Sequence, residues 1–306
     1  MENNKEEVNL IELLKVIWDG KYIISSITLA ASVIAIIYSL SLSDIYRSQA
    51  SLAPVGMEGE NSSGLASQLG GLAGLAGVSI GDNTGSKITI GLEVMQSRRF
   101  FNLIATKHDI VKPLMASKDW DRVNNKVVYD EDIYDPKLNK WVREPSPPKG
   151  SEPSLQEAHL KFSSIFAVIP DKKTGIINLS IEHHSPYIAK QWLDLIIFEI
   201  NNLSRLDDMK QAEKSIDYLK DEIKVTNLNE IKEGISELIQ SQVEKIMLAK
   251  VTPEYLFKII DPPYVAEIKQ GPSRVLIGIL GFLLGFILGV LSVIIRHFTS
   301  INKSQT

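Results

Sequence analysis

The glycine-rich residues 68–83, QLGGLAGLAGVSIGDN, are the first candidates for chemistry, because glycine loops can cradle phosphate groups. A phosphate-binding P-loop has the pattern G-x-x-x-x-G-K-S/T, in which the lysine neutralises phosphate and the hydroxyl holds magnesium. No glycine in residues 64–85 is followed by lysine. The dinucleotide pattern G-x-G-x-x-G is absent as well, because no two glycines of residues 68–83 stand two positions apart. The stretch is therefore neither kind of nucleotide loop.

The same stretch is apolar but conformationally loose. Glycine costs about 1 kcal/mol per helical residue relative to alanine, and the run is too short to span a membrane. We expect it to order against a neighbouring subunit, a lipid or a glycan, and a disordered loop is the alternative. This Leu/Gly segment comprises Leu69, Gly70, Gly71, Leu72, Gly74, Leu75 and Gly77.

Other reactive side chains are sparse. The chain has no cysteine, which removes disulfides, thiolate metal sites and cysteine nucleophiles together. His183 and His184 lack a carboxylate cluster at ligand spacing, and the acidic run of residues 129–135 lacks the glycine and terminal glutamate of an EF-hand. The patterns G-x-S-x-G and H-E-x-x-H are missing too. The sequence predicts no catalytic residue, no metal and no cofactor.

Two long stretches without a charged residue stand out. Residues 22–42 and 275–295 each reach the roughly 20 apolar residues that a helix needs to cross a bilayer core. A buried core helix is the alternative for either. A signal peptide is a further alternative for the first, although its apolar stretch exceeds the usual length and no clear cleavage site follows. We predict two transmembrane helices. The charges that flank them are Lys21 and Asp44 for the first, and Arg274 and Arg296 for the second.

Two spans put both ends of the chain on one side. We expect cytoplasmic tails at residues 1–21 and 296–306 and a periplasmic domain at residues 43–274, although long loops translocate largely regardless of charge. In the first tail, Asn9 and Glu12 have the spacing of a capping box. A short amphipathic helix on the membrane surface and a plain extension of the first span both fit. The net charge of −4 over 306 residues gives no sign of a nucleic-acid partner.

The region between the spans has the mixed pattern of an α+β domain. Residues 45–55 alternate like a strand, whereas residues 92–110 have helical spacing. Residues 117–154 are polar and predict an exposed excursion. Residues 166–186 predict a β-hairpin around the turn DKKTG, and residues 254–264 predict a last strand closed by prolines.

The longest helical pattern covers residues 186–250. It opens with Ser185 as a helix cap and Pro186 at the first helical position. A break at residues 225–229 divides it into a helical hairpin with one apolar stripe per arm. The first arm, of about 40 residues, would be on the order of 60 Å long, and so narrow a stripe needs a neighbour. We expect contacts between copies of the chain at Met209, Ile216, Leu219 and Ile223.

The second span carries glycines at four-residue intervals, a spacing that lets helix backbones approach closely in lipid. We predict a helix-packing face at Gly281, Gly285 and Gly289. A proline-rich segment precedes this span, with Pro262, Pro263 and Pro272.

The whole arrangement resembles the polysaccharide co-polymerases, the Wzz-type chain-length determinants of bacterial surface polysaccharide. The resemblance covers nearly the full chain and includes NLIELLKVIWDGKYII, LGGLAGLAGVSIG and SRRFFNLI. In the closing segment PYVAEIKQGPSRVLIGILGFLLGFILG, Pro263 and Pro272 match the family's prolines, and Gly285 and Gly289 match two membrane glycines. The sequence departs from the family pattern at Ala266, Gly271 and Phe286, where the family has proline, serine and glycine, respectively.

The resemblance implies a membrane-proximal α/β base domain with a long helical arm. It implies several protomers in a ring in the bacterial inner membrane. It also implies a non-enzymatic regulator that sets the modal length of O-antigen or a related glycan with a membrane polymerase. Contact with the growing glycan or its lipid carrier stays open.

Two other functions stay open. One is the membrane subunit of a capsule or exopolysaccharide export system, working with a separate tyrosine kinase because residues 296–306 hold no P-loop. The other is a two-span sensor, which the lack of a signalling module after the second span disfavours.

Overall fold

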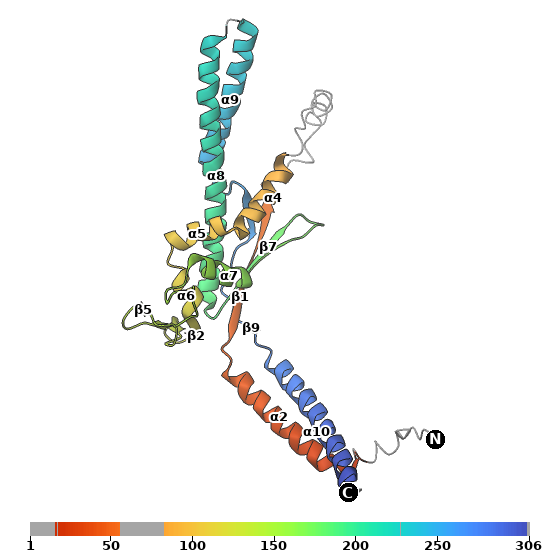
Figure 1. Ribbon diagram of the computed structural model, residues 1–306. Coiled ribbons are helices and arrows are strands. Elements are labelled where there is room, and N and C mark those ends of the chain that lie inside the picture. Colours follow the sequence, from red (N-terminus) through yellow and green to blue (C-terminus); the bar gives the residue numbers. More distant parts are fainter. Residues whose placement is uncertain (1–15, 17, 56–82, 227, 305–306) are drawn as a thin grey trace. The chain divides into compact units, whose positions relative to one another are not determined.

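The computed structural model describes residues 16, 18–55, 83–226 and 228–304 (Figure 1). The chain divides into two compact units. The first consists of Met1–Ile45 together with Lys269–Thr306, and the second is Tyr46–Ile268. The predicted surface helix before the first span falls almost wholly outside the described residues.

Two apolar helices make up the first unit. Helices α2 (Lys21–Ser41) and α10 (Arg274–Ser304) pack along each other, and the short strand β9 (Lys269–Gly271) precedes α10. Mean hydropathy is 2.2 over Lys21–Ser41 and 2.7 over Arg274–His297, so both are long and apolar enough to cross a membrane. Only 17% of each apolar window is buried within the protein, whereas the core helix of a soluble protein is mostly buried.

Helix α10 is longer than the predicted span. It continues past residue 295 to Ser304. Residues 296–304 contain neither proline nor glycine, so no residue there breaks the helix.

An antiparallel sheet lies at the centre of the second unit. Strands β6 (Phe166–Pro170), β7 (Ile177–His183), β1 (Ile45–Pro54) and β8 (Phe257–Asp261) pair in that order. The hairpin predicted between β6 and β7 is confirmed. Its turn contains Gly175 with φ 71°, a left-handed conformation that glycine adopts at little steric cost.

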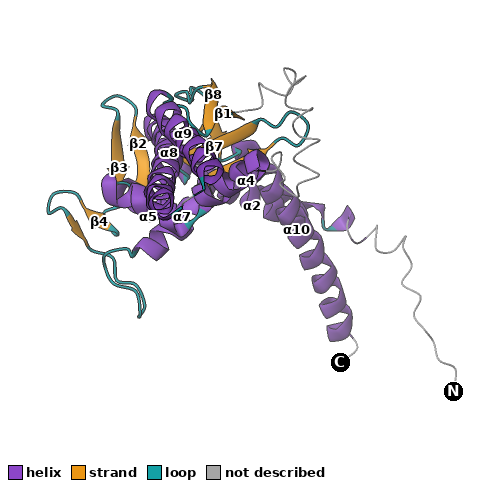
Figure 2. Ribbon diagram, turned by 90° about the horizontal axis from the view of Figure 1, so that it is seen from above, coloured by secondary structure: helices purple, strands orange, loops and turns teal. Residues whose placement is uncertain are grey.

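Helices cover this sheet and build the core with it. Helix α7 (Leu155–Ile165) contacts β6 and β7, and α8 (Pro186–Val225) packs on β7 (Figure 2). Further helices pack beside them, namely α4 (Asn83–Gln96), α5 (Arg98–Lys107) and α6 (Val111–Ala116). Fully buried core side chains include Leu52, Phe100, Ile104, Leu193 and Ile196.

The helix predicted over residues 92–110 is interrupted. Ser97 has an extended backbone with φ −75° and ψ 150°, and its hydroxyl accepts a hydrogen bond from the Phe100 amide at 3.2 Å. Ser97 is thus the N-cap of α5, because a serine oxygen there satisfies an otherwise unpaired backbone donor. The pattern of apolar residues continues through the break, so spacing alone did not reveal it.

The polar excursion of residues 117–154 contains two small hairpins that the sequence did not predict. Strand β2 (Ser117–Asp121) pairs with β3 (Lys126–Tyr129), and β4 (Tyr134–Asp135) pairs with β5 (Lys140–Trp141). Asn125 and Asn139 have positive φ angles of 49° and 51° in the connections. Asparagine tolerates this conformation better than most residues.

The long helical hairpin is formed by α8 and α9 (Asn229–Val251), close to the predicted limits (Figure 1). The first half of α8 is buried in the core, whereas its second half packs against α9. The 40 residues of α8 give a length of about 60 Å. The mixed helix-and-sheet class is confirmed, with an apolar helix toward each end of the chain and a long helical arm.

Candidate functional site

The predicted glycine face of α10 lies against α2. A Cβ atom added at Gly285 would lie 2.7 Å from the Cβ of Ala31 and 2.9 Å from the Cα of Thr28. One added at Gly289 would lie 3.0 Å from the Cα of Ile24, and one at Gly281 would clash with Ala35. The two helices therefore approach each other more closely than a residue larger than glycine would permit at these three positions. A functional role for this face stays a prediction.

An ionic cluster joins the ends of the same two helices. The carboxylate of Asp44 lies 2.8 Å from the Lys269 ammonium and 3.0 Å from the Arg274 guanidinium. Asp44 follows α2, and Arg274 begins α10. Asp44 and Arg274 flank the two predicted spans, and their pairing could not be predicted because it depends on the tertiary contact of α2 with α10.

The predicted prolines stand at the ends of elements. Pro262 and Pro263 directly follow β8, which ends where the backbone loses its hydrogen-bond donors. Pro262 is exposed and Pro263 is buried. Pro272 lies between β9 and α10.

The predicted contact residues of the arm are partly covered within one chain. Ile216 is buried, with 8% of its surface exposed, while Met209, Leu219 and Ile223 are half-buried. Helix α9 therefore covers part of the stripe, and the burial of Ile216 needs no second copy. Contacts between copies at these positions stay a prediction.

Two other candidate sites gain no further support. The Leu/Gly segment, Leu69 to Gly77, lies outside the described residues. Across the ranges that the structure describes, no three His, Cys, Asp or Glu side chains gather as a metal ion would require. In the acidic run, Asp130 instead pairs with Lys118 at 3.3 Å and accepts a hydrogen bond from the backbone of Asp132.

His183 is a structural residue of the second unit. Its Nδ1 atom accepts a hydrogen bond from the backbone of Ser185 at 2.9 Å, and its Nε2 atom lies 3.1 Å from the Pro113 carbonyl oxygen. Because Nδ1 is an acceptor, the proton of the neutral ring is on Nε2. Burial lowers the pKa of His183 to about 4. Both ring nitrogens are thus engaged, and neither is left to bind a metal.

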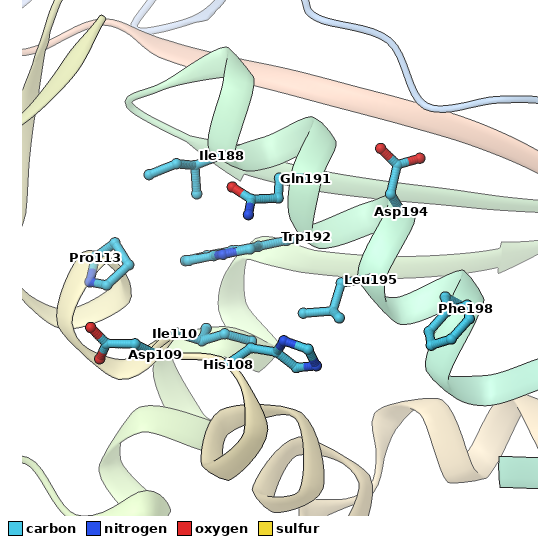
Figure 3. A pocket seen from close by; sticks show the side chains of 10 residues that line it. All are labelled: His108, Asp109, Ile110, Pro113, Ile188, Gln191, Trp192, Asp194, Leu195 and Phe198. Carbon is cyan, nitrogen blue, oxygen red and sulfur yellow. The ribbon is translucent and has the colours of Figure 1, made fainter. Parts of the chain in front are cut away.

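A groove of about 580 Å³ runs along the first half of α8, where it faces the α5–α6 connection. Figure 3 shows Trp192 pointing from α8 toward Pro113, with His108 and Asp109 on the same side as Pro113. Its lining is largely apolar, with Ile188, Leu195 and Phe198 from α8 and Ile110 from the connection. An apolar groove with a few polar side chains has the usual composition of a ligand-binding pocket.

A buried carboxylate lies beside this groove. Glu199 of α8 has a side chain only 4% exposed, and it pairs with Lys107 at 2.9 Å and His108 at 3.3 Å. Burial opposes ionisation, but the hydrogen bonds from Lys107 and His108 outweigh it, so the pKa of Glu199 lies below its usual value. This cluster was not predicted from the sequence. The position of Glu199 among the isoleucines of an apolar helix face was, however, a sign that the carboxylate is buried and needs a partner.

Asp208 is a second carboxylate that the sequence analysis did not single out. It lies 2.6 Å from Lys87 of α4 and 3.5 Å from Lys245 of α9, and it accepts a hydrogen bond from the Tyr255 hydroxyl at 2.7 Å. Burial opposes its ionisation, but these partners lower the pKa of Asp208 overall. The pKa of Tyr255 is raised by burial and by the neighbouring carboxylate. The cluster ties the arm to α4.

The geometry defines a class of protein before any comparison. The chain is an α+β protein with an apolar, membrane-length helix toward each end and a long helical hairpin between them.

A comparison with protein-family models matches the first third of the chain. Residues 6–107 match the model of the Wzz family, described as chain length determinant protein. This match, over one third of the chain, confirms the resemblance to the Wzz-type chain length determinants found in the sequence. No curated protein sequence matches the chain.

One solved structure with a similar arrangement is a full-length bacterial polysaccharide co-polymerase. It is 13% identical in sequence, and the alignment covers 95% of this chain and 98% of that one with a TM-score of 0.43.

Proposed function

We propose that the protein is a non-enzymatic regulator of the modal chain length of a bacterial surface polysaccharide, either the O-antigen of lipopolysaccharide or a related glycan. The observation that carries this proposal is the family match over residues 6–107, a range that contains the whole of α2. The name of the matched family refers to chain length, and the solved co-polymerase supplies the polysaccharide class by its description.

The proposal includes a place in the cell. Helices α2 and α10 cross the bacterial inner membrane, both ends of the chain lie in the cytoplasm, and residues 43–274 lie in the periplasm. The hydropathy of the two helices and their small buried share support spanning. Several copies assemble into a ring that works beside a membrane polymerase, and the growing glycan or its lipid carrier is a further candidate partner.

The test is a gel of surface polysaccharide from a strain that lacks the gene, beside its parent and the complemented strain. We expect the clustered length distribution to collapse into unregulated, shorter chains and to return on complementation. Loss of the polymer from the surface altogether would contradict length control. That result would favour the membrane subunit of a capsule or exopolysaccharide export system, with a separate tyrosine kinase.

A further inference from the structure

A second groove, of about 720 Å³, lies on the second unit and shares Asp109 with the groove along α8. The β4–β5 hairpin contributes Tyr134, Asn139 and Trp141 to its lining, and the stretch before α7 contributes Glu152 and Pro153. We call it the hairpin groove. Its volume falls in the range of pockets that bind small molecules or one end of a larger ligand.

The groove is held in shape by one arginine. The Arg143 guanidinium donates to the Ser151 carbonyl oxygen at 2.7 Å and to the Gly150 carbonyl oxygen at 3.0 Å. It also forms two hydrogen bonds with the Glu157 carboxylate, at 3.1 and 2.8 Å. Glu157 in turn completes the capping box of α7 with Ser154. The stretch before α7 is therefore fastened to the hairpin, and a ligand need not order it.

Aromatic rings form the apolar part of the groove. Tyr134 is 4% exposed, and its hydroxyl donates a hydrogen bond to Oδ1 of Asn139. The Trp141 ring packs edge-on to Tyr134 with the ring centroids 5.2 Å apart, and it is only half-buried. The Lys112 ammonium lies 5.8 Å from the centre of the Tyr134 ring. The buried Tyr134 ring thus supports Trp141, and part of the Trp141 indole remains exposed to a ligand.

Hydrogen-bond donors and acceptors both line the groove beside the aromatic rings. Lys140 supplies hydrogen-bond donors and Glu152 supplies acceptors, and both side chains belong to exposed residues in the lining. Neither forms an ion pair with any other residue that the structure describes. Lys112, in contrast, is paired with Asp109 at 3.2 Å. Lys140 and Glu152 therefore remain available to a ligand.

This combination fits one class of ligand. A pyranose ring presents a face of C–H bonds that complements the negative face of an aromatic ring, while its hydroxyls both donate and accept hydrogen bonds. We propose that the hairpin groove binds a saccharide of the surface polysaccharide, with Trp141 as the stacking surface and Lys140 and Glu152 as hydrogen-bond partners. The inference rests on the proposed function, which supplies the source of the sugar.

The experiment uses the full-length protein in lipid nanodiscs. The probe is a mixture of short oligosaccharides released by mild acid from the surface polysaccharide of the strain that carries the gene. Binding is measured by calorimetry and by saturation-transfer NMR, which reports the sugar protons that touch the protein. We expect Trp141→Ala to weaken binding at least about tenfold and Glu152→Gln to weaken it by a smaller factor.

A matched control lies on the same hairpin. Leu138 is 72% exposed and does not line the groove, so Leu138→Ala should bind as the wild type does. Equal affinity of Trp141→Ala, Glu152→Gln and the wild type would overturn the proposal, and so would a wild type that binds no oligosaccharide at millimolar concentration. Glu152→Gln guards against a folding defect, because its side chain is exposed. The proposed function is tested separately by the length distribution of the gene-deletion strain.

Discussion

At the scale of single residues, buried polar side chains connect helices and strands that lie far apart in the sequence. Asn201 of α8 is buried, and its Oδ1 accepts from the backbone of Leu256 and Phe257, both at 2.8 Å. Its Nδ2 donates to the Phe257 carbonyl oxygen at 3.0 Å. A buried amide that keeps its hydrogen bonds stabilises one arrangement of the chain, because any other leaves polar groups unpaired. Asn201 thereby fixes the start of β8 against the arm.

His183 gives the second unit a defined dependence on pH. Its pKa is about 4 in the folded protein and near 6.5 when unfolded, so between these values the unfolded chain binds the extra proton. The contribution of the neutral ring is fully present above pH 6.5 and is lost as pH falls toward 4. We expect this residue to account for about 3 kcal/mol of the loss of unfolding free energy over that range.

The measurement is urea unfolding of the detergent-solubilised protein at pH 7 and pH 4.5. Trp192 lies 5.0 Å from the His183 ring, so its fluorescence reports locally. His183→Gln should be less stable at pH 7 but lose less stability on acidification than the wild type. His159→Gln is the control, because that imidazole is only half-buried and its Nε2 lies 3.2 Å from the Gln96 carbonyl oxygen. An unchanged pH slope in His183→Gln would contradict the assignment.

At the scale of elements, the two apolar helices form a close pair whose spacing depends on glycine. We expect the double change Gly285→Leu and Gly289→Leu to shift the length distribution of the glycan while the protein level stays normal. A leucine at either site would meet the backbone of α2 rather than a movable side-chain end, so the helices must separate. Polysaccharide gels together with immunoblots measure both quantities.

The chain supplies a matched control for this change. A Cβ atom added at Gly278 meets nothing within 4 Å, so Gly278→Leu adds the same side chain to α10 at a position away from the close contact with α2. It should leave the length distribution as in the wild type. An unchanged distribution in the double variant would count against a role for the glycine face.

Elements with local signals could be predicted from the sequence, and those that depend on tertiary contact could not. Ser185 and Pro186 mark the start of α8, and the turn before Gly175 marks the β6–β7 hairpin, because caps and turns are local. The break at Ser97 was missed because the apolar spacing continues through it, although the serine cap is itself a local signal. The Glu199 cluster was missed because it depends on tertiary contact, since Lys107 lies more than ninety positions away.

At the scale of the whole molecule, a single chain buries only part of the apolar surface of each unit. The first unit pairs its two helices along the glycine face, yet most of their apolar surface stays exposed, as a lipid environment would require. The arm has the same property. Helix α9 covers Ile216 and Ala212 of α8, but apolar side chains remain exposed on both helices, including Leu206, Tyr218, Leu238 and Leu248. Where such side chains adjoin, as Tyr218 and Leu238 do in one surface hollow, they are typical of a contact with another protein.

Self-association through the arm therefore has a specific test. Leu238 is 54% exposed and shares a shallow surface hollow with Tyr218 and Leu219. We expect Leu238→Glu to reduce the assembled mass of the detergent-solubilised protein by native mass spectrometry, because a charge at an apolar contact between copies is costly to bury. Gln211→Glu places the same charge in the same hollow without removing an apolar side chain, and it should reduce the mass less. Ile216→Ala should instead loosen the α8–α9 hairpin itself, by about 2 kcal/mol or more, which thermal unfolding separates from assembly. An assembled mass equal to wild type in Leu238→Glu would remove this face of the arm from the contacts between copies.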